Sequence, residues 1–219
     1  MTSDLCLSLR IPALLVRAHR KGDSMATKED ILEQLIEEYL THKGYFVRHN
    51  IKYLPRKDHP DFVSNQDSNH SDIDVLAINP LLEGPSKVLA ISCKSWQSGF
   101  NPSFELGCIR DKKIVRGRDA WRGFRELVVP KWSEAFLKTV RENTGAKDFT
   151  YVLAVAKVNG DRAVWENAQE FSRALEGNPI RLLTFKEVVE EILPSLGQTI
   201  AATEVGRILQ MFKVSGVQL

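Results

Sequence analysis

The segment SDIDVLAINPLLEGPSKVLAISCKSW, residues 71–96, contains two runs that are rich in β-branched and other apolar residues. The first run is DIDVLAI (72–78) and the second is KVLAISCKSW (87–96), and the sequence between them contains two prolines and a glycine. Apolar runs of this length, bounded by turn-forming residues, are typical of β-strands. We therefore predict a β-hairpin with a long connection.

Polar residues at the ends of these two strands define a candidate site. Alternate side chains share a face of a strand, so Ser92 and Lys94 point the same way, and a register that joins the polar ends places Asp74 beside them. A carboxylate binds a hard divalent cation through oxygen. A neighbouring lysine orients or deprotonates a water molecule, or neutralises charge that develops on a phosphate. The simpler interpretation is that the two charged residues mark solvated strand edges.

The whole chain predicts an α/β domain with a mixed central sheet, in the order α-β-β-β-α-β-α-β-α. The other predicted strands cover residues 45–54, 151–158 and 178–184, and the predicted helices cover 27–44, 103–143 with a break at Pro130, 161–175, 185–193 and 199–212. We expect a flexible leader at 1–24, or an upstream start ahead of Met25, then a folded domain at 25–194 and a C-terminal helical extension at 195–219.

Composition excludes several classes of protein. The apolar fraction of 43% and charged fraction of 26% are close to those of globular domains, and no apolar run approaches the roughly 20 residues that cross a bilayer. The three cysteines are widely spaced and odd in number, which favours reduced thiols in a cytoplasmic protein. The chain has no GxGxxG after a strand and no GxxxxGK[ST], so a nucleotide-dependent metabolic enzyme lacks support.

These features resemble the PD-(D/E)XK nuclease superfamily, which has the restriction-endonuclease-like fold, over about residues 27–160. The first helix (LEQLIEEYLTHKGYFV), the strand SDIDVLAIN, the strand VLAISCKSW and the order α-β-β-β-α-β each resemble parts of the family core. The resemblance implies that Asp74 is the principal metal ligand, that Lys94 is the lysine of the motif and that Glu33 is an accessory acid. Pro60-Asp61 matches the letters PD of the motif, but this pair lies in a polar loop. Asp74, at the start of a strand, is therefore the better candidate for the catalytic aspartate.

The sequence departs from the family pattern at the acid of the (D/E)XK motif. Ser92 occupies that position in Ser92-Cys93-Lys94, and a hydroxyl is a poor substitute for a carboxylate toward Mg²⁺. Some restriction enzymes with this departure supply the acid from the following helix. Glu105, eleven positions after Lys94, is the candidate for such a migrated acid and metal ligand.

A basic stretch follows the hairpin, at residues 110–125 (RDKKIVRGRDAWRGFR). It contains seven Lys and Arg against two Asp, a local balance of +5, whereas the whole chain carries only +2. Such a stretch is suited to contact a phosphate backbone, although a run of charges is also typical of a solvated helix face. The predicted substrate-binding residues are Arg116, Arg118 and Arg122, together with Gln97 just beyond the lysine.

The sequence thus favours a Mg²⁺- or Mn²⁺-dependent nuclease that hydrolyses phosphodiester bonds of DNA, as a restriction-like endonuclease. RNA is the alternative substrate. The alternative function is a catalytically inactive domain of the same fold that binds nucleic acid or a protein partner. Proteins with this fold often act as dimers, so the resemblance also allows a homodimer, and we expect no membrane association.

Overall fold

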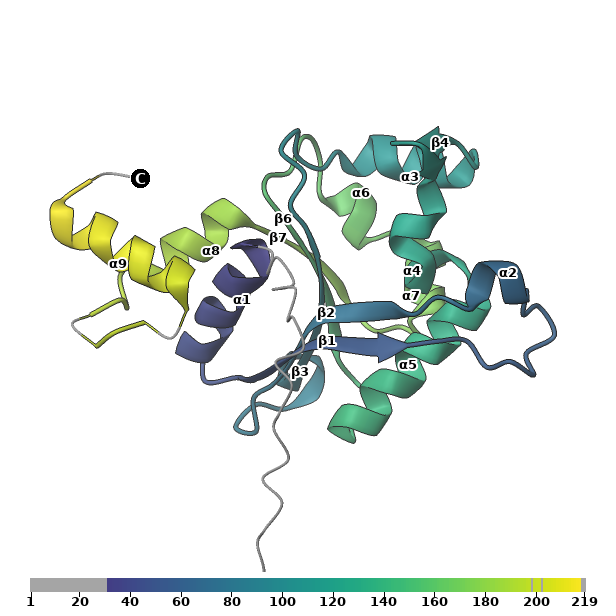
Figure 1. The fold of residues 1–219 in the computed structure, drawn as a ribbon, viewed down its shortest axis with the longest axis horizontal. Coiled ribbons are helices and arrows are strands. Elements are labelled where there is room, and N and C mark those ends of the chain that lie inside the picture. The colour runs from purple at the N-terminus through teal and green to yellow at the C-terminus, as the bar shows by residue number, and fades with distance from the viewer. Residues whose placement is uncertain (1–30, 198, 202, 218–219) are drawn as a thin grey trace, which may run out of the picture.

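The protein is an α/β structure built on a mixed five-stranded sheet (Figure 1). The computed structural model describes residues 31–197, 199–201 and 203–217 of the 219-residue chain. The strands are β1 (Phe46–Tyr53), β2 (Ser71–Ile78), β3 (Val88–Lys94), β4 (Ile114–Val115), β5 (Arg118–Asp119), β6 (Thr150–Val155) and β7 (Ile180–Thr184). The helices are α1 (Ile31–His42), α2 (Ser64–Asp67), α3 (Pro102–Arg110), α4 (Arg125–Val128), α5 (Pro130–Thr144), α6 (Ala163–Glu166), α7 (Gln169–Ala174), α8 (Phe185–Ile192) and α9 (Glu204–Ser215), with 3₁₀ turns η1 (Gly84–Lys87) and η2 (Ala120–Phe124).

The sheet has the order β1-β2-β3-β6-β7. β1 pairs antiparallel with β2 and β2 antiparallel with β3, whereas β6 and β7 join by parallel pairing. Because β3, β6 and β7 are parallel, their carboxyl ends meet at the same end of the sheet. The loop after β3, where Lys94 ends the strand, therefore lies at this end.

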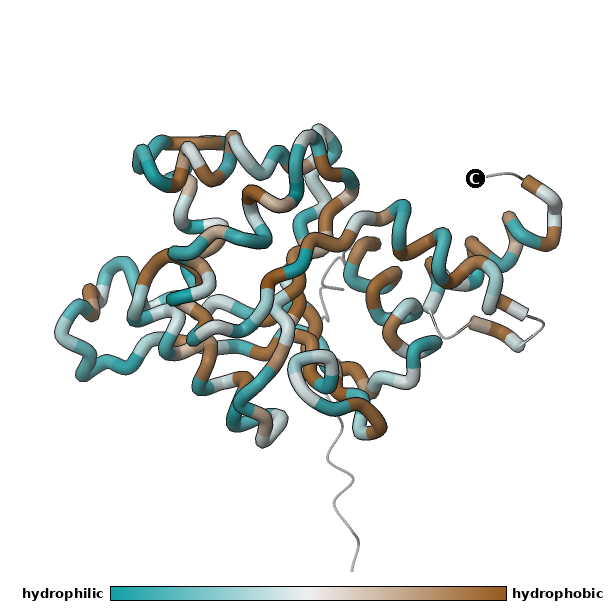
Figure 2. Tube along the Cα trace, turned by 180° about the vertical axis from the view of Figure 1, so that it is seen from behind, coloured by the Kyte–Doolittle hydropathy of each residue, from teal (hydrophilic) through white to brown (hydrophobic). Residues whose placement is uncertain are grey.

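Helices cover both faces of the sheet. Figure 1 shows α1, α8 and α9 on one side and α3 to α7 on the other, and two hydrophobic clusters correspond to these layers. Hydrophobic segments run through the central strands in Figure 2. Among the described residues, no helix has the length and apolar composition that crossing a membrane requires.

The predicted strands and the start of α5 at Pro130 are confirmed, but the prediction of a mainly helical segment at 103–143 is wrong in its middle part. A small hairpin, β4–β5, follows α3 there. Its two connecting residues, Arg116 (φ 54°) and Gly117 (φ 76°), both have left-handed backbone, as a tight hairpin turn requires. The last helix begins at Glu204, after the N-cap Thr203, and not at residue 199. The predicted leader at 1–24 lies outside the described residues.

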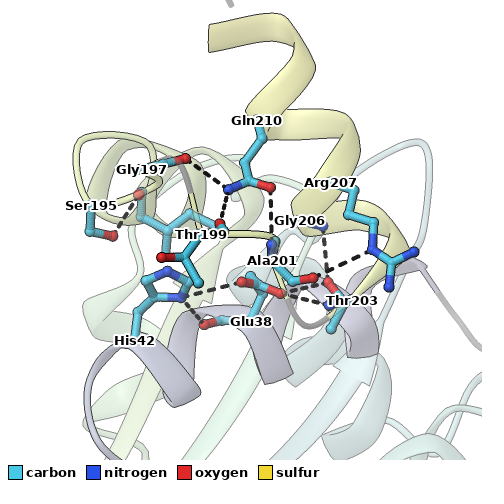
Figure 3. A network of polar contacts seen from close by, with 11 residues as sticks. Glu38, His42, Ser195, Gly197, Thr199, Ala201, Thr203, Gly206, Arg207 and Gln210 are labelled. Carbon is cyan, nitrogen blue, oxygen red and sulfur yellow. Dashed lines mark hydrogen bonds and ion pairs between the residues drawn. The ribbon is translucent and has the colours of Figure 1, made fainter. Parts of the chain in front are cut away.

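The C-terminal helix α9 is attached to α1 through a buried carboxylate (Figure 3). Oε2 of Glu38 accepts hydrogen bonds from the backbone N–H and the hydroxyl of Thr203, both at 2.9 Å. The Thr203 hydroxyl in turn accepts from the backbone N–H of Gly206 at 2.9 Å and so caps the helix. Nδ1 of His42 lies 3.4 Å from the other oxygen of Glu38. These contacts position α9 against the layer formed by α1 and α8.

Replacing Gly206 with alanine is expected to destabilise the protein by about 1–3 kcal/mol, because the contact leaves no room for a methyl group. A Cβ atom at Gly206 would lie 2.5 Å from Cδ and Oε2 of Glu38. Urea unfolding followed by circular dichroism measures the change. Gly107→Ala in α3 is the matched control, since a Cβ there meets nothing within 4 Å. Equal stabilities of the two variants would contradict the tight contact.

Candidate active site

Three of the predicted site residues come together across β2 and β3. Oδ2 of Asp74 accepts a hydrogen bond of 3.3 Å from the Ser92 hydroxyl and lies 3.9 Å from Nζ of Lys94. The Lys94 ammonium donates to the Ser92 hydroxyl at 2.9 Å. Ser92 therefore bridges the acid and the base. The side chains of Asp74 and Lys94 retain 15% and 21% exposure, so both are largely buried but open to solvent.

The local backbone explains how Asp74 reaches this position. Pairing between β2 and β3 begins at Val75 and Ile91, so Asp74 lies just before the paired part of β2. With no strand partner on that side, the backbone N–H of Cys93 donates to Oδ2 of Asp74 at 2.6 Å. On the other side of β2, the pairing with β1 is interrupted at Asn50, which has left-handed backbone (φ 54°). Its neighbours His49 and Ile51 pair with Val75 and Ile73, the neighbours of Asp74. Irregular strand positions of this kind turn a side chain toward a site.

Burial and neighbouring groups act on the pKa of Asp74 in opposite directions. Removal from water raises the pKa of Asp74 above its usual value, while Lys94 and the N–H of Cys93 act in the opposite direction. The negative charges of Asp72 and Glu126 raise the pKa further. Lys94 and the N–H of Cys93 therefore offset only part of the cost of burying this carboxylate.

Glu126, in the short helix α4, was not predicted from the sequence. It is only 5% exposed, and its two carboxylate oxygens accept hydrogen bonds from two buried phenols, Tyr151 at 2.6 Å and Tyr53 at 3.3 Å. Burial and then the charge of Glu126 raise the pKa of Tyr151 well above its ordinary value, while hydrogen bonding with Ser92 acts to lower it. Glu126 is therefore joined directly to the two buried phenols of β1 and β6.

Glu105, the predicted replacement acid, is buried but is engaged elsewhere. Its Oε1 accepts from both terminal nitrogens of Arg116 at 3.0 Å. The Arg116 guanidinium also stacks on the Trp96 ring, with Cζ 3.9 Å from the ring centroid. These contacts satisfy the charge of Glu105 and attach the β4–β5 hairpin to the segment after β3.

The other predicted residues lie on several different elements, and Gln97 and Arg122 contact residues outside this centre. Glu33 is in the first turn of α1, in the helix layer on the face of the sheet opposite α3 to α7. The Gln97 amide donates to the backbone oxygen of Ser95 at 3.3 Å and is exposed. Arg122 pairs with Asp119 at 2.9 Å, and Arg118 is exposed in β5. Cys93 is buried in the cluster under α1, on the face of β3 opposite to that of Ser92 and Lys94.

The donors present are consistent with a cation that keeps part of its water shell. Within the described residues, no three His, Cys, Asp or Glu side chains are grouped as a metal site. Mg²⁺ is commonly bound by only one or two carboxylates, with waters and substrate phosphates completing the octahedron. Asp74 could supply one such carboxylate, and Ser92 beside it adds a neutral oxygen.

Comparison with protein-family models, with curated proteins and with solved structures finds no match for this chain. Function is therefore inferred from the site itself. The sequence offers one faint signal for Glu126. It is an acid within the otherwise basic and apolar run Phe124-Arg125-Glu126-Leu127-Val128.

Proposed function

We propose that the protein is a divalent-metal-dependent nuclease of the restriction-endonuclease-like fold that hydrolyses phosphodiester bonds of DNA. The observation that carries the proposal is the contact of Asp74, Ser92 and Lys94 at the edge of two antiparallel strands. The strand order β1-β2-β3-β6, with α1 on one face, supports the proposed fold class.

Each residue has a chemical role that follows from its position. Asp74, oriented by the N–H of Cys93, would hold a Mg²⁺ or Mn²⁺ ion. The bound ion would polarise the phosphate and lower the pKa of a coordinated water molecule. Lys94 is fixed by Ser92 and points its ammonium toward the same region, where it orients the attacking water or offsets negative charge on the phosphate.

The second candidate function is a nucleic-acid-binding domain without catalysis, and the serine at position 92 favours it. Plasmid nicking with Mg²⁺ and with Mn²⁺ separates the two functions. Cleavage by the wild-type protein that is lost in Asp74→Ala and Lys94→Ala supports the nuclease. If the protein binds DNA but does not cleave it at any metal concentration, the inactive domain is supported. RNA and single-stranded DNA in the same assay test the alternative substrates.

Neutralising Arg116, Arg118 and Arg122 together is expected to weaken DNA binding about tenfold or more at moderate salt. The plot of log K against log salt has a negative slope, and each lost phosphate contact makes it shallower by about 0.9. Fluorescence anisotropy over a salt series measures both effects. The matched control neutralises three lysines just before β1, β3 and β6, at the end of the sheet opposite Lys94: Lys43, Lys87 and Lys147. An unchanged slope in the arginine variant would contradict the assignment.

A further inference from the structure

The most informative group outside the predicted site is the buried carboxylate of Glu126. We propose that Glu126 supplies the second carboxylate for the divalent cation held by Asp74, in place of the acid that is missing at position 92. This inference rests on the proposed metal-dependent function and assigns one residue within it.

The position of Glu126 follows from the register of the sheet. Tyr151 of β6 is paired with Ala90 of β3, so it shares a face with Ala90 and with Ser92 two residues later. That face lies under α3 to α7, and Glu126 reaches it from α4 to accept from the Tyr151 hydroxyl at 2.6 Å. Asp74 reaches the same serine from β2. Asp74 thus contacts Ser92 directly, and Glu126 contacts Tyr151, which the strand register places on the same face as Ser92.

The hydrogen-bond donors to Glu126 among the described residues are neutral. They are the phenols of Tyr53 and Tyr151. The ion pairs of the described residues include none for Glu126, although it is 95% buried, the complement of its 5% exposure. A buried carboxylate without a cation is costly.

Glu105 differs on this point. Both terminal nitrogens of Arg116 donate to its Oε1, so Glu105 is already paired with a cation, whereas Glu126 receives only neutral phenols. An ionised carboxylate has about four acceptor positions, and the two phenols occupy two of those on Glu126. Glu126 therefore retains lone pairs for a cation while its orientation stays fixed by the tyrosines.

The test is Mn²⁺ binding to the full chain by isothermal titration calorimetry, without nucleic acid. Glu126→Gln keeps the size of the side chain and removes its charge, and we expect its Mn²⁺ affinity to fall about tenfold or more. Glu105→Gln removes the competing buried acid, and our proposal requires that it lower the affinity less than Glu126→Gln does. Circular dichroism checks that each variant is folded.

A second measurement needs no variant of Glu126. Because two phenols donate to its carboxylate, Mn²⁺ binding is expected to change the tyrosine absorption of the wild-type protein at the same concentrations that saturate the calorimetric signal. The change should be reduced in Tyr151→Phe.

The outcomes separate the two proposals. If Asp74→Asn binds Mn²⁺ as the wild type does, or the wild type binds none, the metal site of the proposed function is wrong. If Asp74→Asn loses binding but Glu126→Gln keeps it, or binding leaves the tyrosine spectrum unchanged, the assignment of Glu126 is overturned while the proposed function stands. Loss of binding in Glu105→Gln alone would favour Glu105 as the acid.

Discussion

Asp74→Asn is expected to reduce Mg²⁺-dependent cleavage of plasmid DNA by about three orders of magnitude. The amide keeps the shape of the side chain and an oxygen that accepts from Cys93, but it removes the charge that would hold the metal ion. Metal ions contribute several kcal/mol of transition-state stabilisation, and each 1.36 kcal/mol corresponds to a tenfold change in rate. The initial rate of nicking at saturating Mg²⁺ measures the loss.

The same substitution is expected to increase stability at neutral pH. The pKa of Asp74 is raised in the folded protein, mainly by burial, so the folded state binds a proton more tightly than the unfolded state does. The stability contributed by this group is therefore present at low pH and is lost as the pH rises through the raised pKa. Asparagine, which carries no charge, avoids that loss.

Melting temperatures at pH 7 in the absence of metal test this effect. If Asp74→Asn loses cleavage without a fall in melting temperature, the loss comes from the site and not from unfolding. A lower melting temperature would contradict the electrostatic account, and wild-type cleavage by Asp74→Asn would contradict the role of Asp74 as a ligand.

Lys94→Met is expected to reduce cleavage by about 10²- to 10⁴-fold, the range typical of a group that transfers a proton or stabilises charge in the transition state. Methionine keeps an unbranched side chain of similar length without the ammonium that donates to Ser92. Lys94 lowers the pKa of Asp74, so its loss raises that pKa further. The acid limb of the remaining activity should therefore move to higher pH.

Single-turnover rates between pH 5 and pH 9 measure both effects. Lys87→Met is the control, because Lys87 lies just before β3, at the opposite end of that strand from Lys94. Wild-type rates in Lys94→Met, or an acid limb that moves to lower pH, would contradict the role of Lys94.

Much of the fold was predictable because its signals are local. The apolar runs of β2, β3 and β6 and the turn residues between them identify strands without reference to the rest of the chain. The β4–β5 hairpin was not predicted, because each of its strands has only two residues. Its turn also requires left-handed backbone at Arg116, which is uncommon for a residue other than glycine. The late start of α9 has a similar cause, because its cap depends on Glu38 from a distant helix.

The sequence by itself determined the two-strand unit with Asp74, Ser92 and Lys94 at its end, because alternation along a strand decides which side chains share a face. The tertiary structure alone decided which partners the two nearby buried acids have. Glu105 follows Lys94 closely in the chain but turns to Arg116, whereas Glu126 approaches from α4 and is held by tyrosines of β1 and β6. Such a contact depends on packing between elements far apart in the sequence, which no local pattern encodes.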